Sequence, residues 1–455
     1  MLPLRPLAAT IAGTAATLSL SLSLSLSLAP PPAAAAEPFL YIGYCPSWNP
    51  AAIEATDFSP YTHVNIAFAI PQADGSLVLE NEGQLGALAA RIRAQGAKAL
   101  VAVGGYTGSA AFGCAAADAG RAAALSAAIV GFVGRHGLDG VDIDWEYPAG
   151  AGDVANLVTF LATLRGAFDA GGSGGGGGSS SSSSSDDMNR NADDDDGVFK
   201  RRGSKRRGNR KRGGEQDRKI ISMAVPAMPY PGLTPQQARD MSALVDYISL
   251  MQYDINGPWA GETGPNAPFD FEAGRGLQVS FRSSIEAWRA LGWPAERMVA
   301  GLAFYGRAAR ALRDMNAGTR GDAAGNTTAA GDDAAAEGTG NPGAQYAAQS
   351  AERVVGDRDD ACCATGTWKW KWLRQDILTG GVEAPAAPWV RHWDGVSQTP
   401  WLFNSETMVY ITYEDPASIA RKARHAYEEG LRGVMAWSLE MEWDNELVSA
   451  AKELC

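Results

Sequence analysis

The sequence has no excess of positive charge. Its 51 acidic residues outnumber 39 basic residues, and its formal net charge is -12 at pH 7. Phosphate binding needs a basic face, so this balance argues against a nucleic-acid-binding protein and against polyanions as partners. A neutral polymeric substrate suits such a chain.

Beyond its first 28 residues the sequence lacks an apolar run long enough to span a membrane. Residues 1–36 are typical of a secretory signal peptide, with Arg5, an apolar Ser/Leu stretch and small residues ending at Ala36. A transmembrane anchor is the alternative, but the alternation of Ser and Leu makes the stretch only moderately apolar. We therefore expect cleavage after Ala36, secretion into the extracellular space and no stable membrane association.

The sequence also lacks an even number of cysteines. An odd number leaves at least one unpaired thiol or an intermolecular bond, although cysteines as such are compatible with an oxidising compartment. The sequence does not determine their pairing. The five cysteines are Cys45, Cys114, Cys362, Cys363 and Cys455.

Eight short apolar segments recur along residues 37–455, with helical segments between them. This alternation predicts parallel strands joined by right-handed helical crossovers, and eight such strands close a (β/α)8 TIM barrel of the α/β class. The predicted strands are Phe39–Cys45, Thr62–Ile70, Lys98–Gly105, Asp139–Tyr147, Lys219–Met228, Tyr247–Ile255, Met298–Gly306 and Gly433–Leu439. The predicted helices are Ala87–Gln95, Arg121–His136, Val154–Ala170, Pro235–Val245, Ser283–Leu291 and Ser418–Gly430.

Two segments interrupt this repeating plan. Residues 170–217 consist of Gly and Ser runs, an acidic cluster and a basic run, which predicts a disordered surface loop. Residues 308–408 separate the seventh strand from the eighth. Their Gly/Ala-rich first half carries the glycosylation sequon Asn326-Thr327-Thr328, and their aromatic second half predicts a small α+β insertion.

The most informative segment is Asp139–Pro148, DGVDIDWEYP, at the end of the fourth predicted strand. Residues two apart share one face of a strand, so Asp142, Asp144 and Glu146 are expected to form one row directed into the barrel mouth. Three neighbouring carboxyl groups raise the pKa of at least one of them. A protonated carboxylic acid near neutral pH is what cleavage of a glycosidic bond requires. A metal site or salt-bridged cluster is disfavoured, because no His, Cys or basic side chain is interleaved.

The spacing of these acids, D-x-x-D-x-D-x-E, resembles the signature of glycoside hydrolase family 18, the chitinases and their relatives. Matching segments fall at other strand ends: Tyr41-Ile-Gly-Tyr44, Phe68, Met251-Gln-Tyr253-Asp254, Tyr305-Gly-Arg307 and Met435-Ala-Trp437. The resemblance covers nearly all of the mature chain except the low-complexity loop. It implies a secreted chitinase that hydrolyses β-1,4-linked N-acetylglucosamine polymers.

The family implies a retaining, substrate-assisted mechanism, in which the substrate's own N-acetyl group attacks the anomeric carbon. Glu146 would protonate the leaving oxygen and later activate water. Asp144 would orient the acetamido group, passing its hydrogen bond between Asp142 and Glu146, and Tyr253 would donate to the acetamido carbonyl. Expected substrate-binding residues are Tyr44, Phe68, Gly105, Tyr106, Tyr147, Met251, Asp254, Trp259, Arg307 and Trp437.

The expected partners follow from the same resemblance. They are chitin or chitooligosaccharides, with no metal and no cofactor. We also expect a monomeric protein that binds no nucleic acid. For the aromatic and polar residues outside the acidic row, plain barrel packing is the alternative role.

One segment departs from the family pattern. The third strand ends Ala102-Val-Gly104-Gly105-Tyr106, where the family commonly has Ser-x-Gly-Gly-Trp, so a supporting hydroxyl and an indole platform are missing.

Two other functions fit the same barrel. A non-catalytic chitin-binding lectin is disfavoured because such relatives typically lose the last acid of the signature, and this chain keeps Glu146. An endo-β-N-acetylglucosaminidase acting on glycoprotein glycans is the third possibility, against which the Trp437 match and the insertion favour chitin.

Overall fold

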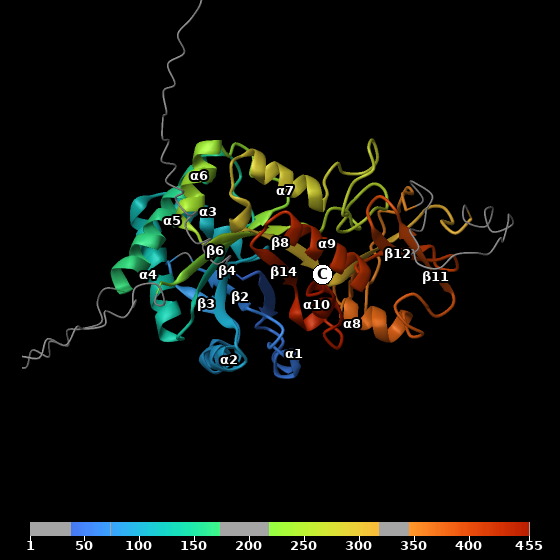
Figure 1. Ribbon diagram of the computed structural model, residues 1–455, viewed down its shortest axis with the longest axis horizontal. Helices are drawn as coiled ribbons and strands as arrows, with labels where there is room; N and C mark the ends of the chain where they lie inside the picture. The colour runs from blue at the N-terminus through green and yellow to red at the C-terminus, as the bar shows by residue number, and fades with distance from the viewer. Residues whose placement is uncertain (1–37, 73, 173–217, 318–344, 455) are drawn as a thin grey trace, which may run out of the picture. The chain divides into compact units, whose positions relative to one another are not determined.

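The computed structural model of the protein describes residues 38–72, 74–172, 218–317 and 345–454. The described residues from Phe39 onward belong to one compact unit of the chain, and many of its helices and strands are labelled in Figure 1. The expected signal peptide, the segment 173–217 and the sequon at Asn326 lie outside the described residues.

The fold is built on a closed barrel of parallel strands. Its strands follow the order β1-β14-β8-β7-β6-β5-β4-β2, and β1 pairs with β2 to close the ring. Every one of these pairings is parallel. The predicted (β/α)8 barrel is therefore confirmed. The barrel strands are β1 (Leu40–Pro46), β2 (His63–Pro71), β4 (Lys98–Gly104), β5 (Gly140–Asp144), β6 (Ile220–Pro226), β7 (Tyr247–Met251), β8 (Met298–Ala303) and β14 (Gly433–Trp437).

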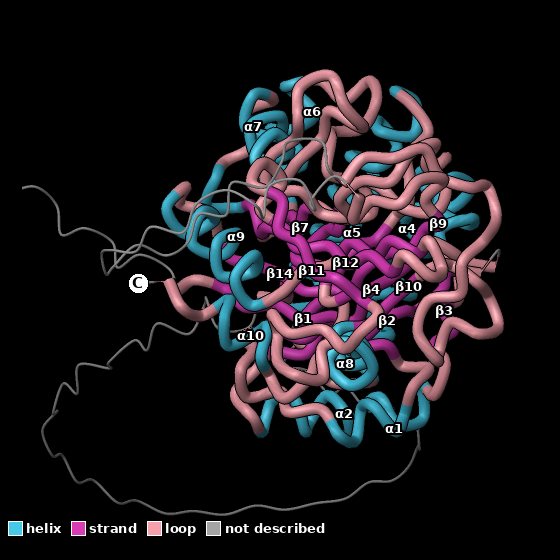
Figure 2. Tube along the Cα trace, turned by 90° about the vertical axis from the view of Figure 1, so that its right-hand side faces the viewer, coloured by secondary structure: helices cyan, strands magenta, loops and turns pink. Residues whose placement is uncertain are grey.

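Helices surround the strands, as Figure 2 shows in cyan and magenta. Each predicted helix is present, and side-chain caps explain several starts: Thr234, Ser280 and Asp415 each accept a backbone N–H of the first turn. Gly137 and Gly430 follow helices with φ of 63° and 69°, as predicted for helix ends. The helices are α1 (Pro50–Ala55), α2 (Glu82–Ala94), α3 (Phe112–Ala116), α4 (Ala119–Arg135), α5 (Ala151–Gly172), α6 (Pro235–Leu244), α7 (Phe281–Ala290), α8 (Trp370–Trp372), α9 (Pro416–Glu428) and α10 (Glu446–Ala451).

Shorter elements complete the chain and were not predicted from the sequence. The strand β3 (Leu77–Leu79) pairs antiparallel with β2 at the edge of the barrel sheet. Single 3-10 turns cover Ser109–Ala111, Ala295–Arg297 and Leu439–Met441, and a π-helical turn covers Leu373–Ile377.

A second, antiparallel sheet lies in sequence between β8 and α9. Its order is β10-β9-β13-β12-β11. The sheet corrects the predicted seventh strand, Met298–Gly306: the barrel strand β8 ends at Ala303, and Tyr305 begins β9. The chain leaves the barrel here because β9 pairs with β10 and β13 instead of barrel strands. Its strands are β9 (Tyr305–Arg310), β10 (Thr367–Lys369), β11 (Trp389–Asp394), β12 (Thr399–Asn404) and β13 (Val409–Thr412).

Two apolar clusters hold the barrel together. The larger fills the space between strands and helices and includes Val141 and Ile143 of β5. The smaller lies inside the barrel and takes residues from β1, β2, β4, β6, β7, β8 and β14. No β5 residue belongs to it, because Asp142 and Asp144 occupy the inward positions of that strand. Most of the barrel interior is thus apolar, and β5 brings charge into it.

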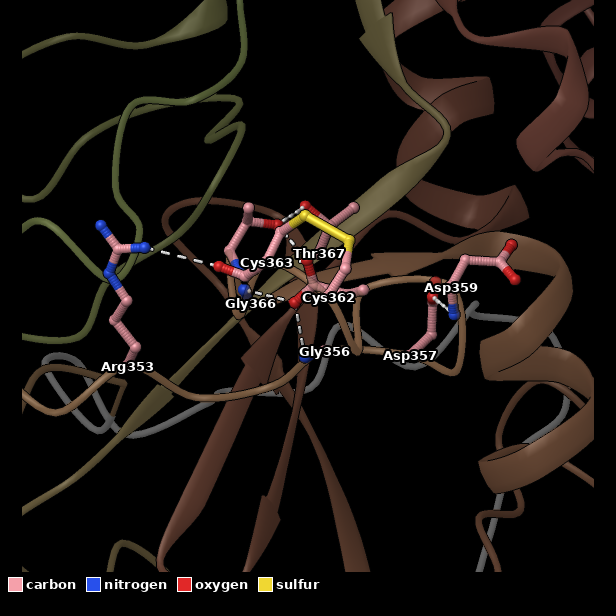
Figure 3. Close-up of a disulfide and its surroundings, with 10 residues drawn as sticks. Arg353, Gly356, Asp357, Asp359, Cys362, Cys363, Gly366 and Thr367 are labelled. Carbon is pink, nitrogen blue, oxygen red and sulfur yellow. Dashed lines mark hydrogen bonds between the residues drawn. A yellow bond between two sulfur atoms is a disulfide. The ribbon is translucent and has the colours of Figure 1, made fainter. Parts of the chain in front are cut away.

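The cysteines divide into a bonded pair and free thiols. Cys362 and Cys363, neighbours in sequence, form a disulfide in the loop before β10 (Figure 3). Cys45 is free and buried, and Cys114 is free and exposed. The expectation of at least one unpaired thiol therefore holds for the cysteines that the structure describes.

Among the described residues, no helix combines the length and apolar character needed to cross a lipid bilayer.

Candidate active site

The acidic row of the sequence gathers at the carboxyl end of β5. Asp142 and Asp144 lie within the strand and are buried, while Glu146 follows two residues later and is half-buried. Val141, Ile143 and Trp145 alternate with the acids and pack into the outer cluster. Asp142 and Asp144 therefore face the barrel interior, as the strand alternation predicted.

The first signature acid has a different position. Asp139 precedes β5, and its Oδ2 accepts a hydrogen bond from the Ala99 N–H at 2.8 Å. It joins the starts of two strands and lies outside the acidic row.

Asp142 is fixed by two hydroxyl groups from neighbouring strands. Tyr44 on β1 donates to Oδ2 and Ser222 on β6 donates to Oδ1, both at 2.6 Å. Burial raises the pKa of Asp142 from 3.8 to about 6, and the two hydrogen bonds oppose part of that rise. Tyr44, expected at the substrate site, is thus buried and acts on Asp142.

The Ser222 hydroxyl gives Asp142 a hydrogen bond that Ala102 has no hydroxyl to provide. Ala102 on β4 and Ser222 on β6 flank Asp142 from opposite sides in the sheet register. Residue 102 is alanine where the family commonly has serine. The hydroxyl that contacts Asp142 comes instead from Ser222 on β6. The available signal was one hydroxyl residue within the apolar run Ile220–Val225.

Asp144 is the middle acid of the row. Burial raises its pKa well above 3.8, and repulsion from Glu146 and then Asp142 adds to this rise. Its Oδ1 is buried and has no hydrogen-bond partner among the described residues. A buried carboxyl with an unused oxygen is suited to bind a polar group brought by a ligand.

Glu146 combines partial exposure with a raised pKa. Burial is the main cause, a hydrogen bond from Tyr147 opposes it, and repulsion from Asp254 adds to it. The backbone N–H of Glu146 donates to the Ser109 hydroxyl at 2.8 Å, and that hydroxyl donates to the Asp144 carbonyl at 3.0 Å. Ser109, which belongs to no motif of the sequence, thereby fixes the chain just beyond the end of β5.

This electrostatic arrangement predicts a pH-dependent cost to folding. A carboxyl with a higher pKa in the folded protein binds its proton more tightly there, so stability falls as pH rises from about 4 to about 6. A pKa difference of about 2 corresponds to ~3 kcal/mol. We therefore compare the change in the free energy of unfolding caused by Asp142→Asn at two pH values. This change is expected to be more favourable at pH 7.5 than at pH 4 by on the order of 2 kcal/mol.

Denaturant unfolding of both proteins at the two pH values measures this difference. Asp240→Asn on the exposed face of α6 makes the same chemical change outside the barrel and serves as the control. A gain for Asp142→Asn that is equal at both pH values would contradict the prediction.

Aromatic rings stack beside the acidic row. Phe68 lies parallel to Trp437, with centroids 5.6 Å apart and planes inclined by 15°, and it also stacks on Trp48 at 6.1 Å. Trp437 and Phe68 are half-buried, whereas Trp48 is 43% exposed. Trp48 extends the stack outward and was missed from the sequence, although an aromatic residue just beyond the first strand was a usable signal.

Gly105 makes room for this stack. A Cβ at this position would lie 2.6 Å from the Phe68 ring, and its φ of 81° is one that favours glycine. The residue therefore shapes the site through the space that it leaves.

Beyond β7, the structure brings a second group of expected residues together. Tyr253 is half-buried and its hydroxyl lies 3.8 Å from the Met435 sulfur, while Met251 packs on the inner cluster. Asp254 forms a two-pronged ion pair with Arg307, with Nε–Oδ1 at 2.8 Å and Nη2–Oδ2 at 2.9 Å. Arg307 lies on β9, so the second sheet contributes to the site.

Three expected aromatic residues lie at the surface. Tyr106 is 81% exposed, Trp259 is 56% exposed and Tyr147 is 46% exposed. The guanidinium of Arg307 lies 5.2 Å from the Trp259 ring centroid, which connects Trp259 to the pair of Arg307 and Asp254. Tyr147 follows Glu146 directly. Tyr106 has the largest exposed fraction of the three.

Within the parts of the chain that the structure describes, no group of three or more His, Cys, Asp or Glu side chains is arranged to hold a metal ion.

Comparisons with known proteins agree with this architecture. The profile of a family described as "Glycosyl hydrolases family 18" matches residues 40–442. A chitinase-like effector from Moniliophthora roreri is 27% identical over 430 residues, 90% of this chain and 91% of that protein. A probable endochitinase from Caenorhabditis elegans is 27% identical over 354 residues, 76% of this chain and 44% of that protein.

Solved structures show the same fold. A chitinase from Rhizomucor miehei superposes with a TM-score of 0.67 at 24% identity, over 91% of this chain and 99% of that one. A class V chitinase from Nicotiana tobaccum, solved in complex with NAG4, has a TM-score of 0.67 at 19% identity, over 92% and 99%. At these identities the two likenesses concern the fold alone.

Proposed function

Because this chain belongs to glycosyl hydrolase family 18, we propose that it is a secreted chitinase that hydrolyses β-1,4-linked N-acetylglucosamine polymers with retention of configuration. The observation that carries the proposal is the row of Asp142, Asp144 and Glu146, in which the pKa of each carboxyl is raised. Chitin oligomers, the ligand named for the tobacco chitinase, are the proposed substrate class here.

The first chemical step needs an acid at the glycosidic oxygen. Glu146 is half-buried and its raised pKa keeps the proton available toward neutral pH. It donates that proton to the leaving oxygen while the substrate's acetamido oxygen attacks the anomeric carbon. The bond between the anomeric carbon and the leaving oxygen breaks, the sugar that carries this oxygen departs, and a cyclic oxazolinium ion remains.

Asp144 acts on the acetamido group. Its unpartnered Oδ1 accepts the acetamido N–H, orients the carbonyl oxygen for attack and stabilises the positive charge that develops. Asp142 and Asp144 are both buried with raised pKa values, so one proton can be shared between their two carboxyl groups. Tyr253 donates its hydroxyl to the acetamido carbonyl, and Trp437 with Phe68 forms the apolar floor beneath the sugar.

Water then completes the reaction. Glu146, now deprotonated, takes a proton from a water molecule that attacks the anomeric carbon on the face vacated by the leaving sugar. The oxazolinium ring opens, and the product keeps the β configuration of the substrate.

The test is the anomeric form of the first product. The protein is incubated with chitin oligomers, and NMR spectra are recorded before mutarotation. We expect β product from N-acetylated oligomers and no cleavage of fully deacetylated ones, which lack the attacking oxygen. An initial α product, or equal cleavage of both substrates, would overturn the mechanism. Release of intact glycans from glycoproteins instead of chitin cleavage would assign the protein to the endo-β-N-acetylglucosaminidases.

A second candidate is a chitin-binding protein without turnover. The name "chitinase-like effector", given to relatives in two Moniliophthora species, describes likeness to a chitinase and leaves activity open. Binding of chitin oligomers without any product would support it.

A further inference from the structure

We infer that Asn266, in the loop after β7, is a positioning residue that holds Asp254 in place for the bound sugar; this inference rests on the proposed function. Asn266 lies 12 residues beyond Asp254 in the sequence, and it is 1% exposed. It does not belong to any motif identified in the sequence.

The backbone of Asp254 has an unusual conformation. Its φ is 57°, in the left-handed region that non-glycine residues adopt at a cost in free energy. Such a conformation persists where surrounding contacts impose it. The contact here is a hydrogen bond of 3.1 Å, in which the Asp254 N–H donates to Asn266 Oδ1. Directly after it, the Ile255 N–H donates to the Asn266 carbonyl at 2.9 Å.

Asn266 is itself held by the second sheet. Its side-chain Nδ2 donates to the Tyr305 carbonyl on β9 at 3.4 Å, and its N–H donates to the Thr412 hydroxyl on β13 at 3.0 Å. The amide oxygen thus faces a hydrogen-bond donor and the amide nitrogen faces an acceptor, which fixes the orientation of the side chain.

The two ends of Asp254 are therefore fixed separately. Asn266 fixes its backbone, and Arg307 on β9 pairs with its carboxylate. Arg307 in turn donates to the Thr367 hydroxyl on β10 at 2.6 Å. Both supports come from or attach to the second sheet, so the placement of Asp254 depends on that sheet.

A double-mutant cycle tests whether Asn266 acts through Asp254. The variants are Asn266→Leu, Asp254→Ala and the combination, measured as kcat/KM on a chitin tetramer and as the Kd for that tetramer. Asn266→Leu is expected to lower kcat/KM by roughly tenfold to a hundredfold, because misplaced binding groups cost rate. In the Asp254→Ala background the same change should cost less than about threefold, since coupled residues are not additive.

Two further variants separate positioning from folding. Asn256 is a matched control, because it is 4% exposed in the same loop and its Nδ2 donates to the Pro265 carbonyl instead of contacting Asp254. Asn256→Leu is expected to leave at least about a third of kcat/KM, because Asn256 makes no hydrogen bond to Asp254 among those of the described residues. Asn266→Asp keeps the acceptor for Asp254 and serves if the leucine variant does not fold. Its activity should approach the wild type at acidic pH and fall as the new carboxyl ionises and loses its donor to Tyr305.

The outcomes distinguish this inference from the proposed function. If the wild type is active and the losses of kcat/KM in the two single variants simply add in the double variant, the role of Asn266 is overturned and the chitinase proposal stays intact. A wild type that binds the tetramer without cleaving it overturns the chitinase proposal, and the cycle in Kd then decides the role of Asn266. A wild type that does not bind the tetramer overturns both.

Discussion

Glu146→Gln is expected to reduce kcat on chitin oligomers by on the order of 10³-fold or more. Glutamine has the shape of glutamate but has no acidic proton to transfer to the leaving oxygen and no carboxylate to take a proton from water. The backbone N–H of residue 146 still donates to Ser109, so the local fold and the affinity for oligomers should persist. Initial rates, tetramer Kd and thermal unfolding together measure these effects.

A matched substitution controls for the loss of one carboxylate. Glu286 on α7 has a largely exposed side chain, so Glu286→Gln should change stability little, as surface substitutions usually do, and leave kcat close to that of the wild type. If Glu146→Gln retained a tenth of wild-type kcat, another group would have to supply the proton, and the proposed role of Glu146 would be wrong.

Asp144→Asn is expected to lower kcat by on the order of 10²-fold to 10³-fold with a small change in KM. The amide oxygen of asparagine can still accept the acetamido N–H, so the ground-state contact remains. The charge that stabilises the oxazolinium ion is lost, and this charge matters only once the ring begins to close. Steady-state kinetics on a chitin tetramer separates kcat from KM.

The same variant should change the pH profile. Repulsion from Glu146 contributes to the raised pKa of Asp144, and repulsion between two carboxylates acts on both of them. Without the Asp144 charge, the pKa of Glu146 is therefore expected to fall. Because Glu146 acts in its protonated form, the decline of kcat at higher pH should move to lower pH. Asp139→Asn is the control, since Asp139 accepts from the Ala99 N–H and its asparagine replacement keeps an acceptor there.

An unchanged pH profile together with an unchanged kcat would contradict the role proposed for Asp144. A rise in KM with unchanged kcat would instead identify Asp144 as a group that binds substrate and transition state equally.

The sequence determined the barrel and the direction of the acidic row. Strand alternation is a local property: side chains two residues apart share a face, whatever else the chain does. Asp142 and Asp144 therefore face the interior while Val141 and Ile143 pack outward, as the alternation predicted. The helices were also predictable because their apolar spacing and caps lie within each segment.

Only the tertiary structure decided which groups support the acids. Ser222 is 80 residues from Asp142 and Ser109 is 37 residues from Glu146 along the chain, yet each is a hydrogen-bond partner. Two further features also depend on distant segments. The strand β8 ends at Ala303, which places Arg307 in the second sheet. Asn266 contacts Asp254 from 12 residues away. Such contacts depend on which distant segments meet when the barrel closes, and no local periodicity of the sequence encodes that meeting.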